Sequence, residues 1–395
     1  MNTQFSKTAL EYFLEISKIP RCSGNEKAAS DYLISFAEGL GFESVRDGDF
    51  NVLIKKPGTE GRENEPPVIL QNHIDIVCEK NKETQHDFEK DPIRPVIDGD
   101  WIRAEGTTLG ADNGAGMSIA MAVLASDNLS HPPIEALFTT FEEVGMTGAT
   151  NFDVSRLQGR QFINLDSGGE GVITVSCASS ADIDIAVKLD KQALPKGYVT
   201  FETTIKGLTG GHSGVDINEG LANANILMAR LLRELDSCCE IYLSGISGGS
   251  MRNAIPRESF ATISCKENDL DAIRSSIKQA ESAFKSEFPK DGGLSVTFES
   301  AEPAESVICR ESFQKILDCV LQAPNGVLAM SAHIEGLVQT SCNLGVIVND
   351  EDAVKLLFFP RSSSSSEQAD TIGKFKTLAG SQGAEIVVAN EKPPW

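Results

Sequence analysis

Basic residues are scarce in this sequence, and long hydrophobic runs are absent from it. The 395 residues include 35 lysines and arginines but 57 aspartates and glutamates, which gives a formal net charge of −22. Nucleic acids and anionic membrane surfaces are bound through clusters of basic side chains, so this charge argues against both partners. No run of about 18 apolar residues is present that could cross a bilayer. Hydrophobic residues make up 41% and charged residues 23%, as in soluble globular proteins.

Targeting signals and paired cysteine motifs are also missing. The first twenty residues have neither a basic start with a long apolar run nor a small-residue cleavage site, so we expect a cytoplasmic location. The nine cysteines are scattered, without a Cys-x-x-Cys pair, and only Cys238 and Cys239 are adjacent. Reduced cytosolic thiols are the simplest interpretation of this pattern.

The length of the chain predicts two domains, since 395 residues exceed what one hydrophobic core usually holds. In the first part, predicted strands at 68–77, 133–143 and 161–167 alternate with apolar helical segments such as 107–126. This alternation is typical of an α/β fold with a mostly parallel sheet. After Val187 the predicted order is strand, helix, strand, strand, helix, strand. That order is typical of a ferredoxin-like unit, and a similar one follows it toward the C-terminus.

Acidic side chains and one histidine stand where the predicted strands and a Gly-rich turn end. In an open α/β sheet, ligands bind outside the carboxyl ends of the strands. Several carboxylates in one closed site need a compensating positive charge, which divalent cations supply. Imidazole and carboxylate ligands together suit zinc. The residues concerned are His73, Asp75, Asp112, Glu142, Glu143 and Asp166.

Spacing suggests how four of these residues divide the work. His73 and Asp75 are two residues apart, so in a strand both side chains lie on one face, and Asp75 can accept the second N–H of the imidazole. Glu142 and Glu143 are adjacent and would point to opposite faces in strand geometry. One glutamate can then bind metal while the other serves as general base for a bound water.

Each of these signals has an ordinary structural alternative. A histidine and an aspartate in one strand often form a structural pair, and two glutamates at a strand end are usually solvated. Asp112 can belong to a simple turn and Asp166 can cap a helix. We favour the metal site because all of these residues occur together and in this order.

Several long segments resemble the M20 metallopeptidase family, in its aminoacyl-histidine (Xaa-His) dipeptidase branch. The resemblance implies an α/β catalytic domain of the zinc-peptidase type, interrupted by an inserted α+β lid domain built from ferredoxin-like units. We accordingly expect a catalytic domain over 1–186, a lid over 187–385, and the start of a return to the catalytic domain at 386–395. The segments are LQNHIDIV, TTLGADNGAGMSIAMAVL, FTTFEEVGMTGA, INLDSGGEG, GLTGGHSGVDI and GGSMRNAIPRE.

The resemblance also implies a role for each site residue. His73 would bind one of two zinc ions, Asp112 would bridge both, and Glu143 and Asp166 would bind one each. Glu142 would be the general base and Asp75 the partner of His73. In the lid, substrate would contact His212, Asn253 and Arg361. The implied substrate is a small dipeptide of the Xaa-His type, cleaved with broad specificity, and a homodimer through the lid is implied as well.

One family feature is not found in this sequence. The resemblance implies a further zinc-binding histidine in a motif of the form HAGLECG near the C-terminus, whereas His86, His131 and His333 lie outside such a motif. We therefore expect a C-terminal segment of the family to be missing, the second zinc to lack its usual histidine, and activity to be impaired. Two alternatives stay open: another M20 amidohydrolase, such as a deacylase or tripeptidase, and an inactive binding or dimerising module.

Overall fold

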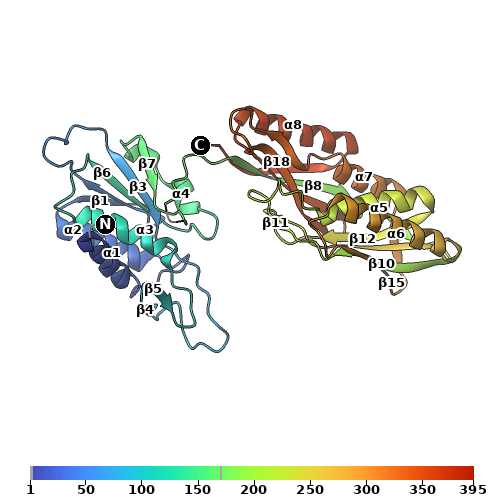
Figure 1. The fold of residues 1–395 in the computed structure, drawn as a ribbon, viewed down its shortest axis with the longest axis horizontal. Coiled ribbons are helices and arrows are strands. Elements are labelled where there is room, and N and C mark those ends of the chain that lie inside the picture. Colours follow the sequence, from blue (N-terminus) through green and yellow to red (C-terminus); the bar gives the residue numbers. More distant parts are fainter. Residues whose placement is uncertain (1–2, 170) are drawn as a thin grey trace. The chain divides into compact units, whose positions relative to one another are not determined.

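The computed structural model describes residues 3–169 and 171–395 of the chain (Figure 1). These form two compact units, residues 1–173 and 174–395. No helix among the described residues is long and apolar enough to cross a membrane. The division falls earlier than the expected boundary at 186, because the strand Ser179–Lys188 belongs to the second unit.

The first unit is built on a mixed sheet with strand order β1-β2-β6-β3-β7. Strand β3 runs parallel to both β6 and β7, whereas β2 is antiparallel to β1 and to β6. The expectation of a mostly parallel sheet is therefore corrected. The chain between β1 and β2 is short enough for a direct antiparallel return, which needs no crossover helix. The strands are β1 (Glu43–Arg46), β2 (Val52–Lys56), β3 (Val68–His73), β6 (Ile134–Thr139) and β7 (Gln161–Asn164).

Three long helices cover one face of this sheet. Apolar side chains of the helices and strands share a buried core that includes Leu33, Met117 and Phe138. A smaller cluster around Leu137 and Phe152 lies apart from it. The remaining elements of this unit are a hairpin and short helical turns. The elements are α1 (Thr3–Ile16), α2 (Lys27–Leu40), α3 (Ala111–Ala125), β4 (Pro95–Asp98), β5 (Trp101–Ala104), α4 (Thr147–Asn151) and η1 (Val154–Arg156).

A disulfide joins Cys22 and Cys78 in the first unit. The expectation that all thiols are reduced is corrected at this pair, while Cys177 and the six other remaining cysteines are free. The two bonded residues are 56 positions apart in sequence. Spacing alone could not reveal them, because the contact is made only when the segment after α1 lies beside the segment after β3.

The second unit has a sheet with strand order β15-β10-β14-β12-β18-β19-β8-β20, and β17 pairs with β18. It contains the ferredoxin-like order twice: β10, α5, β12, β14, α6, β15 and then β8, α7, β18, β19, α8, β20. The strands are β8 (Ser179–Lys188), β10 (Tyr198–Lys206), β12 (Ile241–Gly248), β14 (Ser259–Lys266), β15 (Ser295–Ser300), β17 (Gly326–Met330), β18 (Val338–Asn349), β19 (Ala353–Ser362) and β20 (Glu385–Lys392).

Strand β8 explains why the boundary moves from 186 to 173. It opens the second ferredoxin-like unit although it precedes the first one in sequence, and it pairs with both β19 and β20. Its pairing with β20 also keeps most of 386–395 in this sheet rather than starting a return to the first unit. Alternate residues of β8, such as Ile183 and Ile185, are fully buried, as expected for a strand with one core-facing side.

Four long helices and several short elements complete the second unit. The helices share one hydrophobic core with the sheet, in which Leu231, Phe313 and Phe375 are buried. Asn223 caps the N-terminus of α5, and Ser364 does the same for α8, each through a side-chain oxygen. The elements are α5 (Ala224–Cys238), α6 (Leu270–Glu287), α7 (Arg310–Leu321), α8 (Ser365–Gln382), β9 (Lys191–Ala193), β11 (Gly211–His212), β13 (Ala254–Ile255), β16 (Ser306–Ile308) and η2 (Glu267–Asp269).

Candidate metal centre

The carboxyl end of β3 carries a buried histidine with an aspartate behind it. His73 is the last residue of the strand and only 1% exposed, and Asp75 is fully buried two residues later. Oδ1 of Asp75 lies 3.4 Å from Nδ1 of His73. The other ring nitrogen, Nε2, is then the one that faces the remaining acidic residues.

Two further carboxylates approach Nε2 of His73, and that of Glu143 belongs to the same group of possible metal donors. Oδ1 of Asp112 lies 3.0 Å from Nε2 and Oδ2 of Asp166 lies 3.7 Å from it. One donor atom each of His73, Asp112 and Glu143 lie within 4.8 Å of one another. Asp112 by itself is 73% exposed, and such an acid is common on surfaces without an ion. As a group with a buried imidazole, these three side chains could hold a metal ion.

The segment around Asp112 has an irregular backbone. Gly110 precedes α3 with a positive φ of 69°, a conformation that glycine adopts without strain. Asp112 and Asn113 have non-helical dihedral angles although they lie within the bounds of α3. The carboxylate of Asp112 is therefore presented by a turn at the helix start rather than by a regular helix surface.

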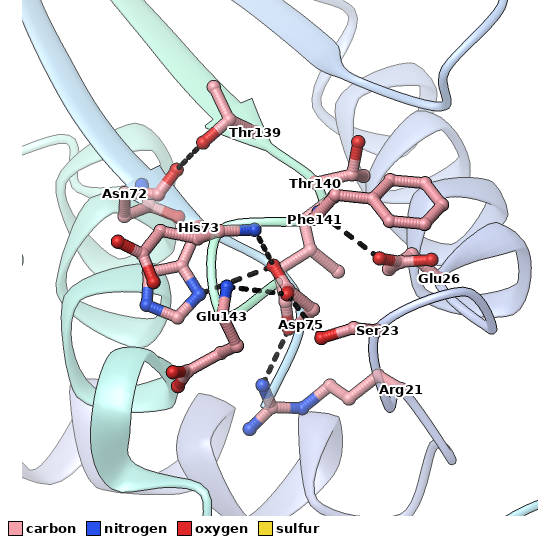
Figure 2. Close-up of polar contacts among 12 residues, drawn as sticks. Arg21, Ser23, Glu26, Asn72, His73, Asp75, Thr139, Thr140, Phe141 and Glu143 are labelled. Atoms are coloured by element: carbon pink, nitrogen blue, oxygen red, sulfur yellow. Dashed lines mark hydrogen bonds and ion pairs between the residues drawn. The ribbon is translucent and has the colours of Figure 1, made fainter. Parts of the chain in front are cut away.

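Asp75 also connects the strand to the turn that carries the two glutamates. Its carboxylate accepts hydrogen bonds from the backbone N–H groups of Glu142 at 3.0 Å and Glu143 at 3.2 Å. The hydroxyl of Ser23 donates to Oδ2 at 2.7 Å. Figure 2 shows Asp75 between Ser23 on one side and the backbone of Glu143 on the other.

Glu142 and Glu143 lie in a turn after β6, not in strand geometry. The prediction that their side chains point to opposite faces assumed a strand at these residues, and the structure has a turn there instead. What distinguishes them is position: Glu143 belongs to the group of three donors, whereas Glu142 does not.

The electrostatics of the site keep the imidazole charged when no metal is bound. Burial by itself would lower the pKa of His73, but the hydrogen bond to Asp75 and the charge of Asp166 raise it to about 9. Burial also opposes the charge of Asp75. Its hydrogen bonds from His73, Ser23 and the backbone nevertheless hold its pKa below the usual range. His73 and Asp75 therefore form an ion pair in the metal-free protein.

Glu142, Glu143 and Asp166 have raised pKa values. Burial raises the pKa of Glu142, and the charges of Asp166 and Asp75 add to it. Burial and the charge of Asp112 raise the pKa of Glu143. Asp166 is shifted the same way, first by burial and then by Asp112. A cluster of acids that cannot all ionise favourably is the environment in which a cation is bound strongly.

The sequence analysis missed residues 21–26, which support the site. Arg21 is 2% exposed and donates to the backbone carbonyls of Ile74 and Gly110. Glu26 is 1% exposed and accepts from the backbone N–H of Phe141 at 3.2 Å. Figure 2 shows Arg21, Ser23 and Glu26 arranged along the edge of the site. The available signal was an arginine five residues after the end of α1, which by itself indicates no particular partner.

In the second unit, the three residues expected to bind substrate lie close together. His212 pairs with Ala254 in a short ladder, and the Ser213 N–H donates to the carbonyl of Asn253 at 2.8 Å. Gly214 lies between two of the side chains: a Cβ added there would be 3.0 Å from Cε1 of His212 and 3.2 Å from Cζ of Arg361. The structure thus brings His212, Asn253 and Arg361 to one place.

Arg361 has the features of a cation held ready for an anion. Its guanidinium lies over the ring of Phe359, with Cζ 4.6 Å from the ring centre. Its Nε is buried and has no hydrogen-bond partner among the residues that the structure describes. Burial also lowers the pKa of the side chain. A buried donor without a partner costs free energy unless a ligand supplies the acceptor.

A mixed α/β unit with a histidine–carboxylate centre, together with a double ferredoxin-like unit, defines a two-domain metallopeptidase architecture. Comparison with known proteins agrees with this class. The family model described as "Peptidase dimerisation domain" (M20_dimer) matches residues 203–292. The cytosol non-specific dipeptidase of Escherichia coli K12 is 39% identical over 386 residues, covering 98% of this chain and 80% of that protein. The chain belongs to the M20 peptidase family.

Two further relatives describe the extent of the likeness. The crystal structure of aminoacylhistidine dipeptidase from Vibrio alginolyticus matches with a TM-score of 0.90 at 40% identity, covering 98% of this chain and 79% of that one. Peptidase T of Escherichia coli O1:K1 / APEC is 38% identical over 137 residues, 33% of each chain. The chain spans about four-fifths of the length of the first two relatives.

Proposed function

We propose that this chain is a metal-dependent dipeptidase of broad specificity, with Xaa-His dipeptides among its substrates. The observation that carries the proposal is the group of donors at the end of β3, where atoms of His73, Asp112 and Glu143 lie within 4.8 Å of one another. The names of the Escherichia coli and Vibrio relatives support a dipeptide as substrate.

The donor set fits zinc, which takes imidazole and carboxylate ligands. We assign His73, Asp112, Glu143 and Asp166 as the residues that would hold two zinc ions. Bound zinc would supply a Lewis acid for the scissile carbonyl and would lower the pKa of a water molecule. Asp75 keeps the proton on Nδ1 of His73, so that Nε2 offers its lone pair to the ion.

Glu142 is the proposed general base. It accepts a proton from water as the water oxygen bonds to the peptide carbonyl carbon. It then returns the proton to the leaving amine as the C–N bond breaks. Its raised pKa suits both steps, because a group that titrates nearer neutrality can accept and release a proton.

The second unit would contribute recognition and assembly. We assign substrate binding to His212, Asn253 and Arg361, with Arg361 binding a carboxylate of the peptide. The match of residues 203–292 to a dimerisation domain supports a homodimer through this unit. A cytoplasmic location is part of the proposal, supported by the name of the Escherichia coli relative.

The decisive experiment is Glu142→Gln in the full chain with zinc at saturation. It keeps the shape of the side chain but removes the base, so hydrolysis of an Xaa-His dipeptide should fall about 10²–10⁴-fold. Glu43→Gln, at an exposed position of β1, is the matched control and should retain wild-type turnover. Wild-type turnover by Glu142→Gln would remove Glu142 from the mechanism.

A second candidate is another amidohydrolase activity of the same family. The likeness to Peptidase T over a third of the chain is the observation that favours testing it. A panel of Xaa-His dipeptides, tripeptides and acyl-amino acids separates the candidates by which substrate is cleaved. An inactive binding or dimerising module would cleave none of them and would bind one zinc ion or none.

A further inference from the structure

Arg21 joins two segments of the first unit that carry proposed metal ligands. Its side chain is 2% exposed. Nη1 donates to the carbonyl of Ile74 at 2.7 Å, and Nη2 donates to the carbonyl of Gly110 at 2.9 Å. Ile74 lies between His73 and Asp75, and Gly110 lies two residues before Asp112. One guanidinium therefore spans the end of β3 and the start of α3.

The backbone around Arg21 holds the side chain in this position. The carbonyl of Arg21 accepts from the Ile76 N–H at 3.1 Å, and Cys22 forms a parallel bridge with Ile76. Ser23, the next residue, donates to the carboxylate of Asp75. The segment from Arg21 to Ser23 thus runs alongside the segment from Ile74 to Ile76. These contacts fix the backbone position from which the Arg21 side chain extends.

The start of α3 is shaped around the guanidinium. A Cβ added to Gly114 would lie 2.6 Å from Nη2 of Arg21, and one added to Gly110 would lie 3.2 Å from it. A side chain at position 114 would fit only if the guanidinium of Arg21 moved, because 2.6 Å is shorter than real Cβ contacts. The close approach that lets Arg21 reach the Gly110 carbonyl therefore depends on glycine at position 114.

The charge of Arg21 matters as well as its donors. Burial lowers the pKa of the side chain to about 10, against the opposing effect of Asp75, so the guanidinium stays charged at neutral pH. An isolated buried cation is costly, and its cost is offset here by two carbonyl acceptors and a nearby carboxylate. The planar fork of arginine can donate in two directions at once, which an ammonium group does less well.

The same unit offers a matched comparison at the other end of α3. Lys56 is 8% exposed, and its Nζ donates to the carbonyls of Val123 at 3.1 Å and Ser126 at 2.6 Å. Lys56 and Arg21 are thus both buried cations that donate to two backbone carbonyls each, and each of them reaches one end of α3. Only Arg21 contacts segments that carry proposed metal ligands.

We propose that Arg21 is a positioning residue for the metal centre: it holds the His73–Asp75 segment and the Asp112 turn at the separation at which their donors can share an ion. This inference rests on the proposed metal-dependent function. It differs from a purely structural role because it requires the loss of Arg21 to change metal binding more than it changes folding.

The test compares Arg21→Met, Arg21→Lys and Lys56→Met in the full chain. Zinc affinity is measured by calorimetric titration, coordination by the visible absorption of bound Co²⁺, and folding by thermal unfolding of the metal-free protein. Arg21→Met should weaken zinc binding at least tenfold and change the Co²⁺ spectrum at saturation, as expected when support behind metal ligands is lost. Arg21→Lys should lie between wild type and Arg21→Met. Lys56→Met should lower the melting temperature but keep the wild-type zinc affinity and Co²⁺ spectrum.

Three outcomes would overturn the inference. In the first, Arg21→Met binds zinc as tightly as wild type, and in the second, Lys56→Met weakens binding equally. In the third, the wild-type chain binds no zinc, which also removes the proposed metal-dependent function, whereas tight wild-type binding with either of the first two results removes only the role of Arg21. If Arg21→Met does not fold, Arg21→Lys decides: weaker binding at an unchanged melting temperature supports the inference, and unchanged binding rejects it.

Discussion

The backbone N–H of Glu142 donates a hydrogen bond to Oδ1 of Asp75 at 3.0 Å. The adjacent N–H, that of Glu143, donates to the other oxygen of the same carboxylate at 3.2 Å. Because Asp75 also lies beside the ring of His73, one buried side chain supports the imidazole and the turn with both glutamates. Removing its charge should therefore disturb all three at once.

Asp75→Asn is expected to weaken zinc binding by roughly 10–100-fold, the usual cost of losing a partner behind a metal ligand. The amide keeps the size of the side chain, but one acceptor oxygen becomes a donor that faces a backbone N–H. Asp47→Asn is the control, since Asp47 also accepts from two backbone N–H groups, those of Asp49 and Asn51. Calorimetric titration with zinc checks the prediction, which fails if both variants bind as wild type does.

The stability of the metal-free protein should fall as the pH rises above neutrality. The pKa of His73 is about 9 in the folded chain, above its usual value of 6.5. The stabilisation from its charged form is therefore fully present below pH 6.5 and is lost as the pH rises through 9. We expect the free energy of unfolding to drop by on the order of 2 kcal/mol over this range. Urea unfolding with a chelator present measures it, and His73→Gln should lack this component of the pH dependence.

Replacing Cys22 and Cys78 together by serine should lower the free energy of unfolding by about 2–4 kcal/mol, because the unfolded chain loses a cross-link. Cys238→Ser, at an exposed free thiol, is the control and should change stability little. Thiol titration of the denatured wild type gives an independent check. Seven reactive thiols should be counted before reduction, and all nine cysteines after it.

Disulfides are uncommon in the reducing cytosol. A count of nine thiols in protein purified without reductant would contradict the Cys22–Cys78 bond and leave the original expectation of reduced cysteines in place. A count of seven, the expected result, would support the Cys22–Cys78 bond.

Arg361→Met should raise KM for dipeptides about 10–100-fold with a much smaller effect on kcat. A hydrogen bond to a charged group contributes about 1.5–3 kcal/mol, and methionine keeps the apolar packing over Phe359 while removing the donors. Dipeptide amides, which lack the carboxylate, should be cleaved poorly by wild type and no worse by the variant. An equal loss for acids and amides would show that Arg361 does not bind the carboxylate.

Local sequence patterns are enough to predict part of this structure. The two-residue spacing of His73 and Asp75 predicted that the pair would be neighbours. The two side chains do meet, although β3 ends at His73 and Asp75 lies beyond the strand. The repeated strand and helix order likewise predicted the ferredoxin-like units, since each element shows its own periodicity. The parallel character of the first sheet was overestimated, because pairing direction depends on which strands become neighbours.

Composition and periodicity are enough to predict the α/β class and two domains, and they place His73, Asp75, Asp112, Glu142, Glu143 and Asp166 at strand ends and a turn, because these are properties of short segments. The choice of Glu143 over Glu142 as a metal ligand came from the resemblance to the M20 family. Three features appear only in the folded chain: Arg21 spans two segments that carry proposed ligands, Cys22 bonds Cys78, and β8 belongs to the second unit. Each of these depends on segments distant in the chain meeting in space. A buried contact of this kind is selected by the packing of the whole unit and leaves no local pattern.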